Sequence, residues 1–359
     1  MTQAMSSNFM LQVLRVALLT GLCGIGAWVQ AAPAEAPVLH LYSARHYATD
    51  EALYNNFTKA TGIQVNRVDA DDAGILARLK AEGASSPADI ILLVDAARLW
   101  KGEVEGLFAP VRSKVLNAAV PAHLRAKERP EGVSWFGLST RARVVVYNKQ
   151  AVKPQEVDTY EKLALPVNKG RLCVRSGAHP YNLSLFGAML EHLGPAKSEA
   201  WLQGLVSNMA RAPKGGDTDQ IKGVASGECG VAISNSYYVA RLMKSAKPED
   251  KEIMSKVAVV FPNQASWGTH VNIAGGAVAK HSSQKALAVR FLEYLVSPEA
   301  QAYFANGNNE WPVVASVKLN NEALATMGGG KFKAETIPVS AVGMNQIKVQ
   351  KMLDRVGFK

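Results

Sequence analysis

The chain has 359 residues and a formal net charge of +10, and 48% of its residues are hydrophobic. This length suits about two domains of ~150 residues each, and the apolar content is too high for an intrinsically disordered protein. Lys and Arg are scattered and form no stripe with interleaved aromatic residues, which argues against nucleic-acid binding. The positive excess instead favours a negatively charged partner or surface.

The first 31 residues have the pattern of a secretory signal peptide. Arg15 is their only charged residue, and a short apolar run over 16–22 and a stretch of small residues ending at Ala31 follow it. A basic residue, a short apolar core and a small-x-small site are typical of such a peptide. The apolar run is too short for a membrane span, which needs about 20 residues. We therefore expect cleavage after Ala31 and export.

Export places the remaining cysteines in an oxidising compartment. Cys173 and Cys229 are the only cysteines beyond the signal peptide, and two are too few for a metal cluster. A single disulfide, which such compartments favour, and a pair of buried free thiols remain alternatives.

Strands and helices alternate along the rest of the chain, a pattern typical of βαβ units and a parallel sheet. Apolar spacing predicts, in chain order, a strand at 38–42, a helix from Thr49 to Gly62, a strand at 63–66, a helix around Ile75–Leu79, a buried strand at 90–94 closed by Asp95 as a helix cap, strands at 144–147, 172–174, 231–233 and 273–278, a helix at 283–295 and a helix begun by Ser297-Pro298-Glu299. No Pro-rich linker lies at the midpoint, so we expect crossing strands to join the domains.

Tyrosines follow three of the predicted strands. His46 and Tyr47 come after the first strand, Tyr181 lies eight residues beyond Cys173, and Tyr237 and Tyr238 begin eight residues beyond Cys229. Ligands of open α/β sheets bind at the carboxyl ends of strands. Adjacent residues of a strand point to opposite faces, so the last two tyrosines meet one ligand only where the chain bends.

Phenolate oxygens suit a hard trivalent cation such as ferric iron. A phenol has a pKa of about 10 and must lose its proton to ligate, and a bound ion of high charge favours that loss. Four phenolates and a neutral imidazole would leave ferric iron with one excess negative charge. Nearby Arg141, Arg143 and Arg175 are candidates to offset it.

Each of these residues also has a simpler interpretation. A single tyrosine or histidine is more often a core or surface residue, and Arg141 and Arg143 alternate with apolar residues as solvated strand residues do. We expect Pro180 to turn His179 away from Tyr181.

The sequence gives little indication of an enzyme. The chain has no Gly-x-Ser-x-Gly, His-Glu-x-x-His, phosphate-loop or dinucleotide motif.

Taken together, these segments resemble the periplasmic ferric-iron-binding proteins of ABC importers, in the tyrosine-rich branch that includes cyanobacterial FutA-type proteins. The resemblance is carried by Ser43–Tyr47, by Cys173–Ser176 with Tyr181-Asn182, and by Asn235–Tyr238. Residues 291–301 also resemble a segment widespread in extracellular solute-binding proteins. The similarity runs from about residue 38 to residue 314.

The resemblance implies an α/β, two-lobed type II periplasmic-binding-protein fold. Each lobe would contain a mixed, mostly parallel sheet flanked by helices, with the ligand in the interlobe cleft. The first lobe would comprise residues 38–139 and about 268–314. The second lobe would comprise about 140–267 and 315–359.

It also implies a set of iron ligands. Tyr47 would come from the first lobe and Tyr181, Tyr237 and Tyr238 from the second, while His46 is a ligand in only some members. Arg143 and Arg175 match positions that hold a synergistic anion such as carbonate or balance the phenolates. Other branches use a glutamate from the first lobe, for which this sequence has no evident match.

We therefore expect a monomeric periplasmic protein without catalytic turnover that captures ferric iron and delivers it to an inner-membrane permease and its ATPase. One alternative is a binding protein of the same fold for an organic or oxyanion solute. A periplasmic metal-dependent hydrolase is the more distant alternative. The visible phenolate-to-iron charge-transfer band would distinguish the first hypothesis from both.

Overall fold

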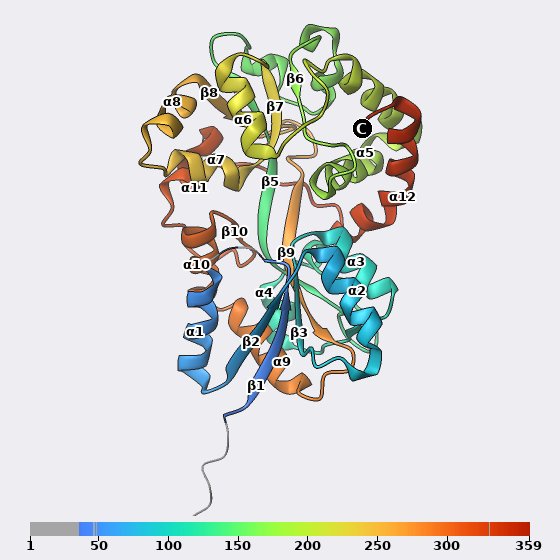
Figure 1. Ribbon diagram of the computed structural model, residues 1–359, viewed down its shortest axis with the longest axis vertical. Helices are drawn as coiled ribbons and strands as arrows, with labels where there is room; N and C mark the ends of the chain where they lie inside the picture. Colours follow the sequence, from blue (N-terminus) through green and yellow to red (C-terminus); the bar gives the residue numbers. More distant parts are fainter. Residues whose placement is uncertain (1–35, 46, 48, 330) are drawn as a thin grey trace, which may run out of the picture. The chain divides into compact units, whose positions relative to one another are not determined.

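Two long strands, β5 (Phe136–Asn148) and β9 (Val271–Ala279), run through the middle of the computed structural model of the chain (Figure 1). The structure describes residues 36–45, 47, 49–329 and 331–359. His46 and the signal peptide expected over residues 1–31 therefore lie outside the described residues.

The strands form one mixed sheet. Within the described part of the chain, ten strands are hydrogen-bonded into it, and its main order is β2-β1-β3-β9-β5-β7-β6. Strand β1 pairs in parallel with β2 and β3, and β6 pairs in parallel with β7, whereas β9 and β5 run antiparallel to their neighbours. The other strands are β1 (Val38–Ser43), β2 (Gln64–Asp69), β3 (Ile90–Leu93), β4 (Phe108–Ala109), β6 (Leu172–Cys173), β7 (Val231–Asn235), β8 (Val257–Val260) and β10 (Trp311–Pro312).

Strand β5 belongs to both halves of the sheet. From Phe136 to Ala142 it pairs with β9, and from Arg143 to Tyr147 it pairs with β7. The backbone N–H of Arg143 donates to the carbonyl of His270, the residue before β9, at 2.9 Å. Crossing strands thus join the two halves, as the absence of a Pro-rich linker at the midpoint of the sequence predicted.

Helices flank the sheet on both sides (Figure 1). None of the helices in the described part of the chain has both the length and the apolar character needed to cross a bilayer. The helices are α1 (Asp50–Thr61), α2 (Asp72–Glu82), α3 (Ala96–Val104), α4 (Lys114–Ala119), α5 (Pro180–Ser207), α6 (Asp217–Ser226), α7 (Ser236–Met243), α8 (Pro248–Lys256), α9 (Lys285–Leu295), α10 (Pro298–Asn308), α11 (Glu322–Thr326) and α12 (Val339–Val356).

Most of the predicted helix boundaries are confirmed by local chemistry. Gly62 ends α1 with a φ of 74°, a left-handed conformation that suits glycine. The side chains of Asp95 and Ser297 cap α3 and α10 by accepting backbone N–H groups. Thr49 precedes α1, but its side chain does not cap the helix. It has helical backbone angles instead of the extended ones of an N-cap, and its hydroxyl donates to Asn308.

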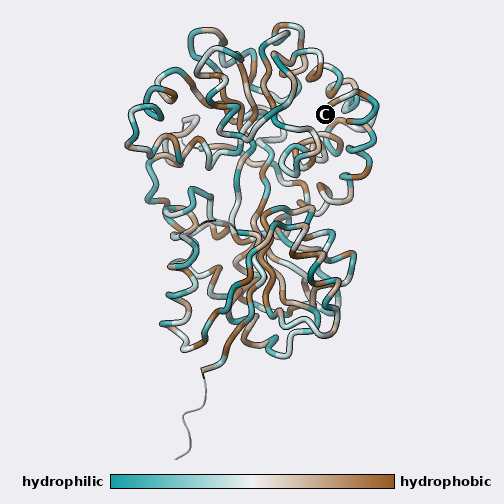
Figure 2. Tube along the Cα trace, viewed as in Figure 1, coloured by the Kyte–Doolittle hydropathy of each residue, from teal (hydrophilic) through white to brown (hydrophobic). Residues whose placement is uncertain are grey.

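The buried apolar side chains form three clusters, and hydrophobic residues follow the strands (Figure 2). The first cluster draws on residues 39–138, 273–313 and 339, and the other two on residues 142–358. Helix α12 packs against both α5 and α3, and its Val339 belongs to the first cluster. The exact lobe boundaries stay a prediction.

The two cysteines form a disulfide. Cys173 ends β6 and Cys229 precedes β7, its parallel neighbour, and their Cα atoms are 5.8 Å apart. Of the two alternatives left open by the sequence, the disulfide is confirmed. It links the end of β6 to the residues that lead into β7.

Removing this disulfide should lower the free energy of unfolding. The loop-closure model gives about 4 kcal/mol for a cross-link that spans 56 residues. We expect the double variant Cys173→Ala/Cys229→Ala to show a loss of this order in urea unfolding without reductant. The parent protein unfolded with reductant is the matched control. An unchanged unfolding free energy would contradict the prediction.

Candidate metal centre

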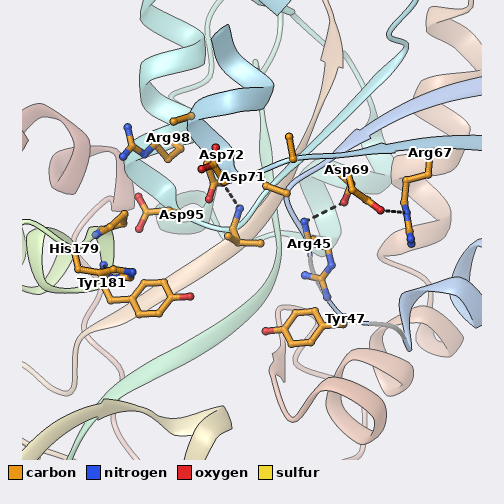
Figure 3. A pocket seen from close by; sticks show the side chains of 16 residues that line it. Arg45, Tyr47, Arg67, Asp69, Asp71, Asp72, Asp95, Arg98, His179 and Tyr181 are labelled. Carbon is orange, nitrogen blue, oxygen red and sulfur yellow. Dashed lines mark hydrogen bonds and ion pairs between the residues drawn. The ribbon is translucent and has the colours of Figure 1, made fainter. Parts of the chain in front are cut away.

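Four tyrosine side chains converge beside the crossing strands. Tyr47 lies in the loop after β1, Tyr181 in the first turn of α5, and Tyr237 and Tyr238 in the first turn of α7. The hydroxyl oxygens of Tyr181 and Tyr237 are 3.1 Å apart. The Tyr237 ring centroid lies 4.3 Å from that of Tyr238 and 6.2 Å from that of Tyr47. In Figure 3 the hydroxyls of Tyr47 and Tyr181 point toward each other.

The adjacent tyrosines meet because the chain changes conformation just before them. Strand β7 ends at Asn235 and α7 begins at Ser236. Consecutive residues of a helix are about 100° apart around its axis, whereas those of a strand point to opposite faces. The expected bend is therefore present, and it allows the side chains of Tyr237 and Tyr238 to turn toward one ligand.

Burial raises the pKa of three of these phenols, those of Tyr47, Tyr181 and Tyr237. It raises the pKa of Tyr181 to about 12, with a further contribution from Tyr238. The pKa of Tyr237 is raised well above its usual value by burial and by the neighbouring Tyr181 and Tyr47. Burial and the carboxylate of Glu310 do the same for Tyr47. A cation that binds here as a phenolate complex must displace these protons.

Glu310 is a buried acid of the site that the sequence analysis did not identify. Its Oε1 accepts the Tyr47 hydroxyl at 3.3 Å, and its Oε2 accepts Ser139 at 2.8 Å and Arg45 at 3.3 Å. Arg45 also pairs with Asp50 at 2.6 Å. Glu310 lies 263 residues beyond Tyr47 and arrives through the pairing of β10 with β5. A contact between residues so far apart in the chain leaves no local sequence motif from which it could be predicted.

Arg141 is buried next to the tyrosines. Its side chain is 3% exposed, and its Nη1 is 3.9 Å from Glu310 Oε1. Among the described residues, neither of its terminal nitrogens has a hydrogen-bond partner. Burial alone would lower its pKa, but Glu310, Tyr181 and Tyr237 raise it. The interpretation of Arg141 as a solvated strand residue is therefore wrong, because this part of β5 is buried on both faces.

Arg143 and Arg175 share one carboxylate. Arg143 Nη1 donates to Asp217 Oδ2 at 2.5 Å, and Arg175 Nη1 donates to Asp217 Oδ1 at 3.1 Å. Arg143 is buried too, so the solvated interpretation is also wrong for it. Both guanidinium groups lie beside the Tyr181 ring, with their Cζ atoms 5.9 and 5.1 Å from its centroid. These distances are within the range of cation–π contacts.

His179 contacts Tyr181, contrary to the expectation that Pro180 turns it away. Pro180 is the first residue of α5, which makes His179 the N-cap, and its Nδ1 accepts the backbone N–H of Tyr181 at 3.2 Å. The two ring centroids are 4.5 Å apart. Burial and the nearby Arg175 lower the pKa of His179 to about 4. The ring is thus neutral at pH 7, with its proton on Nε2.

Tyr47 and Tyr181 border a cavity of about 810 Å³. Its walls come from residues 43–45, 47, 67, 69–73, 94, 95, 98 and 179–181 (Figure 3). A water molecule occupies about 30 Å³ of liquid, so the cavity is much larger than one ion needs. Arg98 and Asp72 lie on its far wall, where burial raises the pKa of Asp72 to about 6.

Comparison with known proteins identifies the family. The profile of bacterial extracellular solute-binding proteins matches residues 52–327. The chain belongs to this family. It is therefore a solute-binding protein and not an enzyme, which excludes the hydrolase alternative.

Its relatives include proteins named for iron. The chain is 45% identical over 327 residues to iron uptake protein A1 of Synechocystis, an alignment that covers 91% of this chain and 89% of that protein. It is 48% identical to the Trichodesmium protein IdiA (FutA) solved in complex with iron and citrate ligands, and 43% identical to apo FutA2 from Synechocystis. Both structures match with a TM-score of 0.84 over 90% of this chain and 100% of theirs. The match confirms the expected two-lobed α/β fold.

Ultraviolet titration of the metal-free protein tests the buried phenols. An exposed tyrosine ionises near about pH 10, whereas Tyr181 should ionise near pH 12. A raised folded-state pKa means that the neutral phenol stabilises the fold below about pH 10, and that this contribution is lost as the pH rises through the folded-state value. Tyr181→Phe should therefore remove one group that ionises near pH 12. Loss of a group that ionises near pH 10 would contradict this.

Proposed function

We propose that this protein captures ferric iron with the phenolates of Tyr47, Tyr181, Tyr237 and Tyr238 and delivers it to the permease and ATPase of an ABC importer. The observation that carries the proposal is the convergence of four tyrosines from three separate segments, with two hydroxyl oxygens 3.1 Å apart. Adjacent oxygens on a small octahedral cation bound at about 2.0 Å are about 2.8 Å apart. The separation of the Tyr181 and Tyr237 oxygens is close to that value.

The charges around the cluster favour a trivalent ion. Four phenolates leave ferric iron with one excess negative charge and a divalent ion with two, and uncompensated charge is costly in a buried site. The buried guanidinium of Arg141 lies next to the tyrosines, 3.9 Å from the carboxylate of Glu310. Arg143 and Arg175 stand behind Tyr181 and share the single carboxylate of Asp217, so one of their two positive charges remains for charge balance. His46, next to Tyr47 in the chain, is a further proposed ligand.

The rest of the cavity suits a chelator or a synergistic anion. The Trichodesmium relative was solved with citrate as well as iron, and the cavity extends well beyond the tyrosines. Arg98 and the Nε2–H of His179 lie on its wall as donors for carboxylate or carbonate oxygens. We propose that such an anion accompanies the ion here.

The proposed capture of iron takes place in the periplasm, between two lobes that close on the ion. We propose a periplasmic monomer released from its signal peptide, with lobes of residues 38–139 and about 268–314, and of about 140–267 and 315–359. Tyr47 comes from the first lobe and the other three tyrosines from the second, so the ion stabilises the closed form by bonding to both. The permease then recognises that closed form.

Replacement of either tyrosine of the pair should weaken ferric binding. Tyr237→Phe and Tyr238→Phe each remove one charged oxygen donor and keep the ring. We expect at least a tenfold loss of affinity, about 1.4 kcal/mol, in competition with citrate, and a weaker charge-transfer band. Tyr147→Phe, in β5 and outside the cluster, is the matched control. Unchanged affinity and spectrum in both variants would contradict the phenolate site.

Tyr47→Phe should affect closure more than capture. Three phenolates remain in the second lobe, so the ion still binds, while the bond to the first lobe is lost. We expect small-angle scattering to show a smaller decrease in the radius of gyration on addition of ferric citrate than in the parent protein or in Tyr147→Phe. Full compaction of the variant would mean that another group, such as His46 or a bound anion, bridges the lobes.

A further inference from the structure

The carboxylate of Asp217 is completely buried behind the tyrosine cluster. Asp217 is the first residue of α6, and none of its side chain is exposed. It accepts hydrogen bonds from three separate segments: from Arg143 in β5, from Arg175 in the loop before α5, and from the backbone N–H of Asn235 at the end of β7. A single side chain therefore holds three parts of the chain together.

Two of these segments lead directly to the proposed ligands. Asn235 comes two residues before Tyr237, and its N–H is 2.7 Å from Asp217 Oδ2. On the other side, Arg143 Nη2 donates to the Asn182 side chain at 2.7 Å, and Asn182 follows Tyr181. The Asn182 amide in turn donates to the carbonyls of the loop before α5 at 3.1 and 3.0 Å. The network reaches both turns from behind, without contact to the hydroxyls.

The charge of Asp217 is as important as its hydrogen bonds. Arg143 and Arg175 would otherwise repel each other beside the Tyr181 ring, and a buried guanidinium without a carboxylate partner is strongly unfavourable. Hydrogen bonds to charged groups are also shorter and stronger than those between neutral groups. The carboxylate thus fixes both arginines, and through them the loop that carries Tyr181.

We propose that Asp217 is a positioning residue for the iron site. It holds Tyr181 close enough to Tyr237 and Tyr238 for the three tyrosines to bind one ion. The inference rests on the proposed function in so far as these tyrosines bind iron. It adds a residue that never touches the ion, and it explains how two turns that are 56 residues apart keep their hydroxyls 3.1 Å apart.

The same network is tied to the crossing strands. Arg143 is the residue of β5 at which pairing passes from β9 to β7, and its N–H donates to His270. The hydroxyl of Tyr160 donates to the Arg143 carbonyl and accepts the His270 N–H. The position of the second-lobe tyrosines is therefore set relative to the strands on which the lobes would move.

The experiment compares Asp217→Asn with Asp219→Asn in the full chain. Asp219 lies two residues along the same helix, is exposed, and accepts the Gly216 N–H at 2.8 Å, so its replacement also weakens the start of α6. With ferric citrate as probe, we expect Asp217→Asn to lose at least tenfold in affinity and to shift and weaken the charge-transfer band. The control should keep both. A role in stability alone would lower the melting temperature without moving the band.

Retention of the parent's band and affinity by Asp217→Asn would overturn the proposal. If that variant does not fold, Arg175→Gln decides, because it removes one arm of the network and leaves Asp217 paired with Arg143. We expect a band shift of the same sign and smaller size. An unchanged band in Arg175→Gln would then overturn the proposal.

A readout without metal separates this inference from the proposed function. Tyrosine Cζ signals in ¹³C NMR, assigned with the Tyr→Phe variants, report the contact between Tyr181 and Tyr237. Asp217→Asn should shift both signals in the metal-free protein, and unchanged signals would overturn the positioning role. A parent protein that shifts in this way but develops no ferric band would contradict the iron site and support the positioning role.

Discussion

The protonation of buried phenols is the constraint on which the tyrosine site depends. Burial raises the pKa values of Tyr47, Tyr181 and Tyr237. The hydroxyls of Tyr181 and Tyr237 hydrogen-bond to each other, and that of Tyr47 donates to Glu310. Their ionisation becomes favourable only when a cation of high charge replaces the protons. In the proposed site, the burial that raises these pKa values therefore also disfavours ions too weakly charged to displace several protons at once.

The buried arginines near the tyrosines differ in how their charges are paired. Arg45 is paired with Asp50 and Glu310, and Arg143 is paired with Asp217. Arg141 is different, because its terminal nitrogens have no hydrogen-bond partner among the described residues and its nearest carboxylate oxygen is 3.9 Å away. A buried guanidinium in this state gains most from negative charge that develops on neighbouring phenols, so its stabilisation increases when the tyrosines ionise.

The sequence predicted the elements that depend on local chemistry. Alternation of strands and helices predicted a parallel sheet, to which the structure adds the antiparallel strands β5 and β9. The Ser297-Pro298-Glu299 pattern predicted the start of α10, and the adjacent tyrosines indicated a bend before Tyr237. Glu310 and Asp217 were not predicted, because each reaches the site through contacts with residues 18 to 265 positions away. The predicted orientation of His179 is wrong for a local reason. Pro180 is the first residue of α5, so His179 becomes the N-cap and its ring faces Tyr181.

One face of β5 connects the two half-sites. Ser139, Arg141 and Arg143 alternate along the strand, and side chains two residues apart lie on the same face. Ser139 and Arg141 approach Glu310, the neighbour of Tyr47, while Arg143 binds Asp217, which stands behind Tyr181 and Tyr237. The strand that joins the halves therefore also carries the polar groups that hold the proposed ligands of each. A change in its curvature between Arg141 and Arg143 would move one set of tyrosines against the other while each kept its own buried partners, which is the motion that capture between two lobes requires.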